Sequence, residues 1–392
     1  MPDAFIVDAV RTGSGRGKPG GALSGVHPVD LLATVLESLV QRTGIDPAAI
    51  DDVIAGCVTQ AGEQSVNIAR NAVFAAGFPE TVPATTVDRQ CGSSQQAAAF
   101  AAQGVLAGYY DVVIACGVES MSRAPMFSAM QGKDVYGAKL AARYPDGLVT
   151  QGISAEIISA RWKLDREALD TFAAQSHARA AAAAAAGDFD AEIVPVPVGD
   201  TEHRADETIR PTTTVDGLGR LAPAFVGDPA GDRFAEIEWS ITAGNSSPLT
   251  DGASAVLIMS ERALTRFGLA PRARFHSFAV TGDDPVLMLT GIIPATRKAL
   301  ERTGLSIDDI AAYEVNEAFA PVPLAWLNDL AADPARLNPR GGAIALGHAL
   351  GASGARLLTT LLGVLEATGG RYGLQTMCEG GGMANATIIE RL

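Results

Sequence analysis

The sequence repeats one pattern of segments, and this internal duplication limits the possible folds more than any other feature. Each copy has the pattern of a helix, a short turn and a buried strand. The copies share two later features, a Gly- or Ser-rich turn before a further helix and a strand that carries a cysteine. The matching segments are 42–45 with 302–305, 51–54 with 308–311, the turn at Cys91 with that at 347–354, and 111–117 with 373–378. Their shared order favours a duplicated α/β fold with two mainly parallel sheets and crossover helices.

A segment of different composition separates the two halves, from about Ser120 to Trp239. It is rich in proline, glycine and charged residues, and we expect one clear helix within it. Asp165 is a good N-cap for that helix, the alanine run 180–186 favours it, and Gly187 ends it. An insertion of this length in a compact fold is usually a lid, a binding loop or an interface. We therefore expect it to cover a ligand.

The charge and composition argue against several classes of partner. The chain of 392 residues has a formal net charge of −14, whereas proteins that bind nucleic acid or anionic membranes need a basic surface. No stretch approaches the roughly 18 to 20 consecutive apolar residues that cross a bilayer, and the first residues lack the blocks of a signal peptide. We therefore expect a cytoplasmic protein without a nucleic-acid partner or membrane insertion. Its four cysteines do not suggest a disulfide scaffold.

Cys91 is the strongest candidate for a catalytic residue. It follows a short β-type stretch and precedes the alanine-rich run 95–106, which places it at the N-terminus of a helix. The macrodipole and the unpaired N–H groups there stabilise a thiolate, so we expect the pKa of Cys91 to fall toward neutrality, with Arg89 adding positive potential. A structural cysteine lies more often inside an apolar run. Cys57 and Cys116 do so, and we assign them to the core.

Two polar clusters in the second half are candidates for the same site. Asn316 and Glu317 follow a buried strand, where α/β sheets place their ligands, although the pair could equally cap a helix. His348 lies in the glycine-rich segment 341–354 and suits a general base or a hydrogen-bond donor, although a lone histidine is usually structural. The glycines of this segment do not have the spacing of a dinucleotide-binding motif.

A third cluster contains a second thiol. Cys378 follows a strand and precedes the glycines at 380–382, whose backbone N–H groups could form an oxyanion site. We expect this thiol to act as an acid or a base. No pair of cysteines or histidines has the spacing of metal ligands, so we expect no metal site.

Together these motifs resemble those of the thiolase family of acyl-CoA acyltransferases. The resemblance covers nearly the whole chain, and it is specific because four modest motifs occur in one order and spacing. They are Cys91-Gly92-Ser93, Asn316-Glu317-Ala318-Phe319, Gly347-His348 and Cys378-x-Gly380-Gly381-Gly382. The resemblance implies two βαβαβαββ halves in five layers, α-β-α-β-α, with a loop domain inserted in the first half. The implied domains are an N-terminal half of residues 1–119 and 240–268, a loop domain of residues 120–239, and a C-terminal half of residues 269–392.

The resemblance also implies a two-thiol mechanism. Cys91 attacks the keto carbon of a 3-ketoacyl-CoA while His348 takes its proton. Carbon–carbon cleavage then leaves an acyl thioester on Cys91 and an acetyl-CoA enolate, which Cys378 protonates, and a second CoA accepts the acyl group. His348 and a water held by Asn316 stabilise the enolate, and the N–H groups of Cys91 and Gly380 stabilise the tetrahedral intermediate.

A binding site for acyl-CoA follows from the same resemblance. CoA is a co-substrate, and no permanently bound cofactor is expected. The loop 242–247 resembles the family's pantetheine-contacting loop, with Ser247 as its main hydrogen-bonding residue. The expected substrate and CoA contacts are Ser247, Ala243, Leu148, Ala318 and Phe319. The family usually forms homodimers or homotetramers, so a second copy of the chain is the expected partner.

Two departures from the family pattern bear on specificity. Ala349 stands where a proline is common, and we expect altered fine geometry with retained activity. The stretch 149–156 lacks the histidine of the His-Met-Gly segment found in short-chain biosynthetic members, which favours a degradative enzyme for medium, long or bulky chains. A biosynthetic acetoacetyl-CoA thiolase is the alternative. Cys378 argues against a ketoacyl synthase, and Cys91 with His348 argues against a non-catalytic acyl-CoA- or lipid-binding protein.

Overall fold

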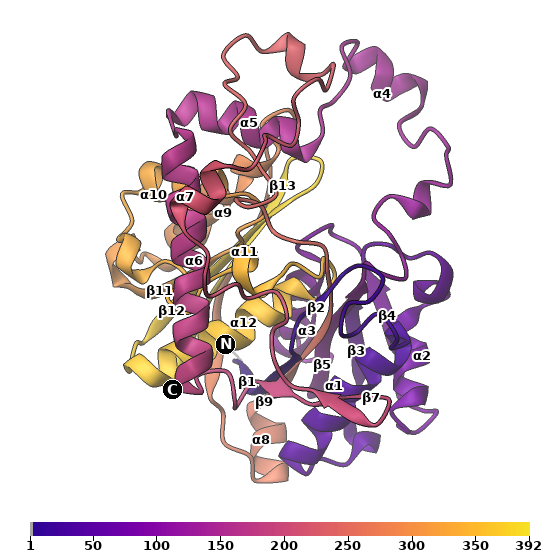
Figure 1. The fold of residues 1–392 in the computed structure, drawn as a ribbon. Coiled ribbons are helices and arrows are strands. Elements are labelled where there is room, and N and C mark those ends of the chain that lie inside the picture. The colour runs from indigo at the N-terminus through magenta and orange to yellow at the C-terminus, as the bar shows by residue number, and fades with distance from the viewer. Residues whose placement is uncertain (1–2) are drawn as a thin grey trace.

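The duplicated halves are visible in the order of the elements. The computed structural model describes residues 3–392 (Figure 1). The first half contains β1 (Ala4–Thr12), β2 (Gly15–Arg16), α1 (Pro28–Thr43), β3 (Asp52–Gly56), α2 (Ile68–Ala75), β4 (Ala84–Val87), α3 (Ser93–Leu106), β5 (Val112–Ser120) and β9 (Thr250–Ser260). After α8 (Glu261–Phe267), the second half contains β10 (Ala273–Gly282), α9 (Ile292–Thr303), β11 (Ile310–Val315), α10 (Pro321–Leu330), α11 (Ala343–Leu346), α12 (Ser353–Thr368), β12 (Tyr372–Glu379) and β13 (Met383–Arg391).

The matching segments adopt matching conformations. Helices α1 and α9 both end at a Thr-Gly pair, where Gly44 and Gly304 take left-handed φ values of 66° and 73°. Each glycine ends its helix because it enters this conformation without a Cβ penalty. A short 3₁₀ turn and a buried strand, β3 or β11, follow in both halves. The predicted match of 42–45 with 302–305 is therefore confirmed. The predicted match of 51–54 with 308–311 is wrong by three residues, because Asp308 and Asp309 lie within the 3₁₀ turn of the second half, whereas Asp51 and Asp52 follow the turn of the first.

The sheet registers correct one of the predicted matches. Cys116 of β5 pairs with Ala55 of β3, and Thr376 of β12 pairs with Val315 of β11. Ala55 lies 13 residues after Arg42, and Val315 lies 13 residues after Arg302. Cys116 therefore corresponds to Thr376, and the earlier match of Cys116 with Cys378 is wrong by two residues. The same register makes Glu119 the counterpart of Glu379.

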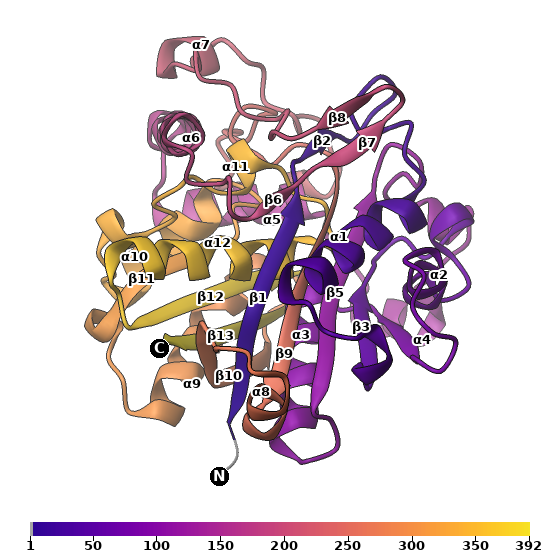
Figure 2. The same cartoon turned by 90° about the horizontal axis from the view of Figure 1, so that it is seen from below.

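The two predicted sheets are joined into one 11-stranded sheet, whose main path runs β11-β12-β13-β10-β1-β9-β5-β3-β4. Antiparallel pairing of β1 with β10, at Phe5↔Arg274 and Ile6↔Ala273, makes this join (Figure 2). Parallel pairing along this path is limited to β5-β3-β4 in the first half and β11-β12 in the second. The other neighbours within each half pair antiparallel, because β9 and β13 run against both of their neighbours. The prediction of mainly parallel sheets is therefore wrong. Periodicity within one strand cannot reveal that its edge meets a distant strand.

Helices α3 and α12 pack side by side between the two halves, and each contacts strands of both halves. Side chains of both helices share one apolar core, among them Ala98 and Leu358. Helices α1 and α2 cover the outer face of the first half, and α9 and α10 lie on the outer side of the second. The predicted five-layer order is thereby confirmed.

The inserted segment holds more helix than the sequence indicated. Its elements are α4 (Gly137–Arg143), α5 (Gln151–Trp162), α6 (Arg166–Ala186), β6 (Ile193–Val194), β7 (Val196–Val198), β8 (Thr201–His203) and α7 (Val215–Gly219). The predicted helix is α6, with Asp165 as N-cap and Gly187 as a left-handed C-cap. Helix α5 was missed because residues 152–159 are all buried, so the helix lacks a polar face and its 3.6-residue periodicity. The domain boundaries at 120 and 239 remain a prediction.

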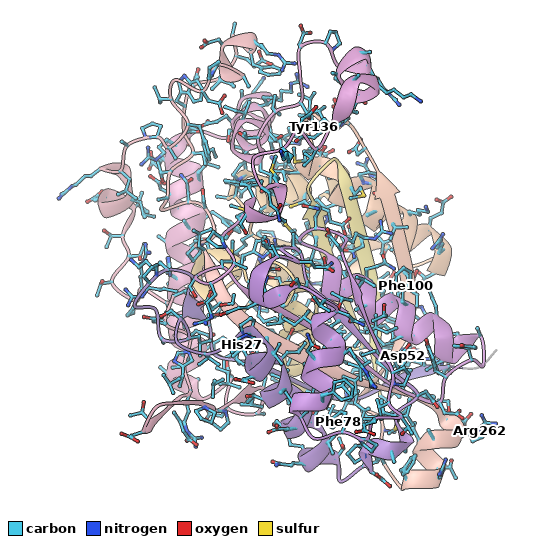
Figure 3. The ribbon with its side chains drawn as sticks, turned by 90° about the vertical axis from the view of Figure 1, so that its right-hand side faces the viewer. His27, Asp52, Phe78, Phe100, Tyr136 and Arg262 are labelled. Carbon is cyan, nitrogen blue, oxygen red and sulfur yellow. The ribbon has the colours of Figure 1, made fainter. Side chains whose placement is uncertain are left out.

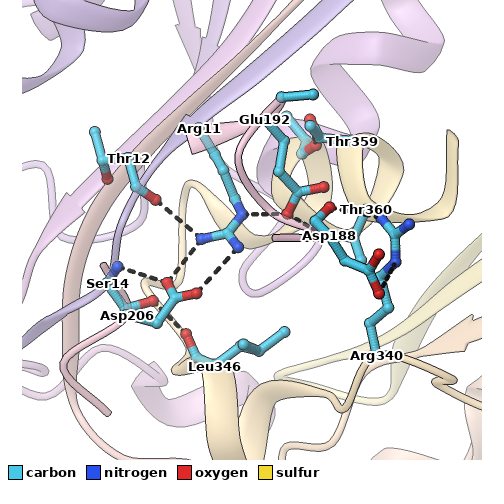
Figure 4. Close-up of polar contacts among 12 residues, drawn as sticks. Arg11, Thr12, Ser14, Asp188, Glu192, Asp206, Arg340, Leu346, Thr359 and Thr360 are labelled. Atoms are coloured by element: carbon cyan, nitrogen blue, oxygen red, sulfur yellow. Dashed lines mark hydrogen bonds and ion pairs between the residues drawn. The ribbon is translucent and has the colours of Figure 1, made fainter. Parts of the chain in front are cut away.

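A buried ion cluster fastens this segment to both halves (Figure 4). Arg11 of β1 donates from Nε to Glu192 at 2.7 Å and from Nη1 and Nη2 to Asp206 at 2.7 and 3.0 Å. Thr360 of α12 donates to the same Glu192 at 3.1 Å. Removing one partner would leave an uncompensated buried charge, which costs about 3 to 5 kcal/mol. The cluster therefore holds the insertion in one position.

The same cluster reaches the short helix α11. Asp206 accepts a hydrogen bond from the backbone N–H of Ser14 at 2.8 Å, and the Ser14 hydroxyl donates to the carbonyl of Leu346. Thr208 of the insertion donates to the carbonyl of Ala345 at 2.7 Å. These contacts fix the end of α11, directly before the turn that carries His348.

No helix of residues 3–392 combines the length and apolar character that a membrane crossing requires.

The approach of α3 to α12 gives the first testable prediction. A Cβ on Gly354 would lie 2.1 Å from the backbone nitrogen of Gln95. Gly354→Ala should therefore force the two helices apart and lower the free energy of unfolding by about 1 to 3 kcal/mol. Gly219→Ala, at the exposed end of helix α7, is the control, because its Cβ would meet open space. Equal unfolding curves for both variants in urea would contradict the proposed tight contact.

Candidate active site

A tight turn between β4 and α3 carries Cys91. Gln90 has a left-handed φ of 48°, a conformation that is costly for a residue with a side chain. Ser93 fixes the turn, since its hydroxyl accepts from the Arg89 N–H at 2.9 Å and donates to the Gln90 carbonyl at 2.6 Å. The turn places Cys91, which is only 5% exposed, two residues before the first residue of α3. The predicted location at a helix N-terminus is confirmed.

The prediction that this location lowers the thiol pKa is wrong. Burial raises the pKa of Cys91 to about 12, and the negative charge of Glu379 adds to the rise. Hydrogen bonds from Gln151 and from the backbone favour the thiolate, but they do not offset the loss of hydration. The resting nucleophile is therefore a thiol, and its attack requires a base.

His348 has the tautomer that such a base needs. Ser353 uses its hydroxyl proton to donate to the Ala349 carbonyl at 2.8 Å. The same hydroxyl oxygen, 2.6 Å from His348 Nδ1, therefore accepts a proton donated by that nitrogen. Nε2 keeps its lone pair and can accept a proton. Burial and the charge of Arg356 lower the pKa of His348 to about 3, so the imidazole is neutral.

The backbone around His348 is set by two close contacts. Gly347 takes a left-handed φ of 83°, and a Cβ there would lie 2.6 Å from Thr250 Oγ1. The same hydroxyl accepts from the His348 N–H at 2.9 Å. Glycine at 347 is therefore required for the turn. Ala349 is buried within it, and the helix α12 begins four residues later at Ser353.

Asn316 lies beside His348, as predicted. Its side-chain nitrogen is 3.3 Å from Nε2 of His348, and the lone pair there makes Asn316 the donor. Its side-chain oxygen is buried and has no hydrogen-bond partner in the part of the chain that the structure describes. A buried amide oxygen without a partner is costly, and a small polar molecule that donates to it would remove that cost. This favours the predicted use of Asn316 to hold a water.

Cys378 is the second-last residue of β12 and is buried. Cys91 packs in one apolar cluster with Leu350 and Met377, the near neighbours of His348 and Cys378. Burial raises the pKa of Cys378 well above its ordinary value, with Cys91 among the causes. Both thiols are therefore protonated at neutral pH, and Cys378 is poised to give up a proton to a carbanion.

Gly380 follows at the turn from β12 to β13. Its Cα lies close to Gln90, since a Cβ there would be 3.0 Å from Gln90 Oε1. Gly381 and Gly382 have φ values of 84° and 78° and close the turn. Gly380 is therefore next to the Cys91 turn, as its predicted role in an oxyanion site requires.

The structure brings most of the predicted binding residues close together. The Ser247 N–H donates to the Ala318 carbonyl at 3.0 Å, and Ser246 forms a β-bridge with Phe319. Phe319 packs against Phe225 of the insertion, with ring centroids 6.3 Å apart. Phe225 and Val149, the residue after the half-buried Leu148, share one apolar cluster.

Ala243 is exposed on the same loop. Asn245 stabilises that loop from inside, because its side-chain oxygen accepts from the Thr242 N–H at 2.8 Å and its nitrogen donates to Asp170 at 2.9 Å. Loop 242–247 is thus held against both the second half and the insertion.

The sequence reasoning missed two residues of this site. Ser353 fixes the tautomer of His348, and its only sequence signal is its place at the start of a helix five residues later. Gln151 begins α5 and hydrogen-bonds to Cys91. The sequence signal for Gln151 was its place in the stretch 149–156, but helix α5, which orients its side chain, was not predicted.

Family models match almost the whole chain. The thiolase N-terminal domain matches residues 4–262, and the thiolase C-terminal domain matches residues 269–391. The chain belongs to the thiolase family. The resemblance inferred from four motifs is therefore confirmed, together with the acyltransferase class and the fold.

Curated thiolases resemble the chain over its full length. A steroid 3-ketoacyl-CoA thiolase of Mycobacterium tuberculosis is 52% identical over 100% of this chain and 95% of its own length. A 3-ketoacyl-CoA thiolase of Erwinia tasmaniensis is 46% identical, and one of Salmonella typhimurium is 44% identical, each over 100% of both chains.

The neutral, buried imidazole gives the second testable prediction. His348 has a pKa of about 3 in the folded protein and an ordinary value of 6.5. Between these values the unfolded chain binds more protons, so the stability that neutral His348 provides is present above pH 6.5 and is lost as pH falls. From pH 7 to pH 5, wild type should lose about 2 kcal/mol more unfolding free energy than His348→Asn. Urea unfolding at both pH values measures the difference. The same pH dependence in both proteins would show that His348 is protonated in the folded state.

Proposed function

We propose that this thiolase cleaves 3-ketoacyl-CoA to acetyl-CoA and an acyl-CoA shortened by two carbons, with CoA as co-substrate. One observation carries the proposal. A buried thiol, Cys91, shares a buried region with a neutral imidazole whose Nε2 can accept a proton and with a second protonated thiol, Cys378. Carbon–carbon thiolysis needs all three groups.

The first half-reaction forms the acyl-enzyme. His348 Nε2 takes the Cys91 proton as the sulfur attacks the keto carbon. The bond between that carbon and its α-carbon breaks, and the electron pair goes to the thioester enolate. Cys378 protonates the α-carbon, which releases acetyl-CoA and leaves an acyl thioester on Cys91 and a thiolate on Cys378.

The second half-reaction restores both thiols. The Cys378 thiolate takes the proton of the incoming CoA thiol as the CoA sulfur attacks the acyl thioester. The Cys91 sulfur leaves and takes back the proton held by His348. Both thiols and the imidazole end the cycle in their starting protonation states, and the CoA thiol supplies the proton that leaves on acetyl-CoA, so the cycle needs no cofactor and no external acid.

Two oxyanions form during this cycle, and each has a candidate donor set. The N–H groups of Cys91 and Gly380 flank the carbon attacked at Cys91, which the closeness of Gly380 to Gln90 supports. The enolate oxygen would meet His348 and a water on Asn316, which the unpaired amide oxygen supports. Donors fixed in a buried site are effective because they need no reorganisation as charge develops.

The acyl chain is proposed to be medium, long or bulky. The stretch 149–156 lacks the histidine of the His-Met-Gly segment that the family resemblance gives to short-chain biosynthetic members, and the name of one relative specifies steroid substrates. Loop 242–247, with Ser247 and Ala243, is proposed to hold the pantetheine arm. Leu148, Ala318 and Phe319 are proposed to contact the substrate. A biosynthetic acetoacetyl-CoA thiolase remains the alternative, because the same groups catalyse the reverse condensation.

A homodimer or homotetramer in the cytoplasm completes the proposal. Residues 123–147, which include α4, form an arm that projects from the body (Figure 1). The arm exposes Phe127 by 69% and Tyr136 by 59%, and Phe100 on α3 is also exposed (Figure 3). Exposed apolar side chains that gather on one arm are typical of surfaces that meet a partner. All four cysteines are free, which suits a reducing compartment.

The third prediction concerns substrate. The purified protein should cleave 3-ketoacyl-CoA in the presence of CoA, and kcat/KM should be higher for a long-chain or steroid-derived ketoacyl group than for acetoacetyl-CoA. Loss of the ketoacyl-CoA absorbance measures the rate for each chain. A preference for acetoacetyl-CoA would favour the biosynthetic alternative. Acyl-CoA binding without turnover on any chain would contradict thiolase activity.

The fourth prediction separates the two thiols. Cys91→Ala should abolish both acyl-enzyme formation and turnover, by at least about 1000-fold. Cys378→Ala should still accept an acyl group on Cys91 from an acyl-CoA, while carbon–carbon cleavage falls by about 100- to 10,000-fold. Mass spectrometry follows the acyl-enzyme, and Cys116→Ala in the core is the control. Unchanged cleavage in Cys378→Ala would reject its role as the proton donor.

A further inference from the structure

Glu379, the residue after Cys378, is a buried carboxyl that the proposed cycle does not use. It is 0% exposed, and neither carboxyl oxygen has a hydrogen-bond partner among residues 3–392. The carboxyl lies against the backbone of Gly92, next to Cys91, where a Cβ on Gly92 would be 2.0 Å from Glu379 Oε1. It therefore lies next to one thiol in sequence and next to the other in space.

The duplication supplies an internal comparison. Glu119 occupies the equivalent position in the first half, and all its acceptor capacity is used. Its oxygens accept from the backbone N–H groups of Val58, Thr59 and Gly351 at 2.9, 3.0 and 2.9 Å and from the side chain of Gln64 at 2.8 Å. Glu119 thus has a structural explanation. Glu379 has no such structural explanation. An unpartnered buried carboxyl costs free energy, and groups with such a cost persist mainly at functional sites.

The surroundings of Glu379 come from the loop before α3 and from β13. Burial raises its pKa to about 8, the charge of Arg89 opposes the rise, and the charge of Asp88 adds to it. Asn385 of β13 is close, but its amide nitrogen donates to the Gly92 carbonyl at 3.2 Å. Burial raises the pKa of both thiols, and the charge of an ionised Glu379 adds to the rise.

We propose that Glu379 is a positioning residue that sets the proton affinity of Cys91 and Cys378 through its buried charge. Above about pH 8, where its carboxyl is ionised, Glu379 opposes a thiolate on either sulfur, so both thiols stay protonated into the alkaline range. Cys378 then carries the proton that the enolate needs, and Cys91 gives up its proton only to His348 during attack. This inference rests on the proposed two-thiol centre, and it adds a third ionisable group to that centre.

The fifth prediction measures the reactivity of each thiol, which requires no turnover. Iodoacetamide alkylation of Cys91 and of Cys378 is followed by mass spectrometry from pH 6 to pH 10 in wild type and Glu379→Gln. At pH 9, where wild-type Glu379 is charged, both thiols should react about tenfold faster in Glu379→Gln, as a one-unit fall in thiol pKa produces. At pH 6.5, where the carboxyl is neutral, the two proteins should react alike.

Two further measurements protect this test against a purely structural effect. Glu379→Asp keeps the carboxyl and should retain the wild-type pH profile, as should Glu301→Gln at an exposed position. In wild type alone, the alkylation rate should rise less than tenfold per pH unit near pH 8, because ionisation of Glu379 opposes thiolate formation. A tenfold rise through that range, or a Gln/wild-type ratio that is the same at both pH values, would overturn the proposal. A separate thiolysis assay reports on the proposed function, so the two can fail independently.

Discussion

The close approach of α3 and α12 is the contact on which the rest of the site depends. Gly354 allows it, because its missing side chain leaves room for the backbone at Gln95. The Ser94 hydroxyl then accepts from the Ala355 N–H at 2.9 Å, a hydrogen bond between the two helices. Since each helix comes from a different half, their crossing brings the turn at Cys91 and the turn at His348 into one buried region. A duplicated fold thereby forms a single catalytic centre.

Burial of that region determines how its protons are distributed. Loss of hydration disfavours every charged form, so the resting site holds two thiols and a neutral imidazole. Charge is created only during the reaction, next to N–H groups that are already in position. Ser353 makes this possible by fixing the proton on Nδ1 of His348. The site thus works by general base catalysis from neutral groups, and not with a thiolate formed in advance.

Local signals allowed the sequence to predict much of this arrangement. Gly44 and Gly304 end matching helices, and the N-cap at Asp165 and the glycine at 187 bound α6, because a cap acts on its own neighbours. The β-type stretch before Cys91 and the alanine-rich run 95–106 after it likewise located this thiol at a helix N-terminus. The parts that failed depend on distant contacts: the edge where β1 meets β10, and the fully buried helix α5. The predicted fall in the pKa of Cys91 was wrong for the same reason, since a helix end can be recognised in the sequence and the desolvation of the thiol cannot.

The transfer of one acyl group to Cys91 in a single turnover tests the account most directly. The protein would be mixed with one equivalent of a 3-ketoacyl-CoA without free CoA, stopped by acid, and digested for mass spectrometry. The account predicts one equivalent of acetyl-CoA, the remaining acyl group on Cys91, and none on Cys378. An acyl group on Cys378, or cleavage without any acyl-enzyme, would contradict it.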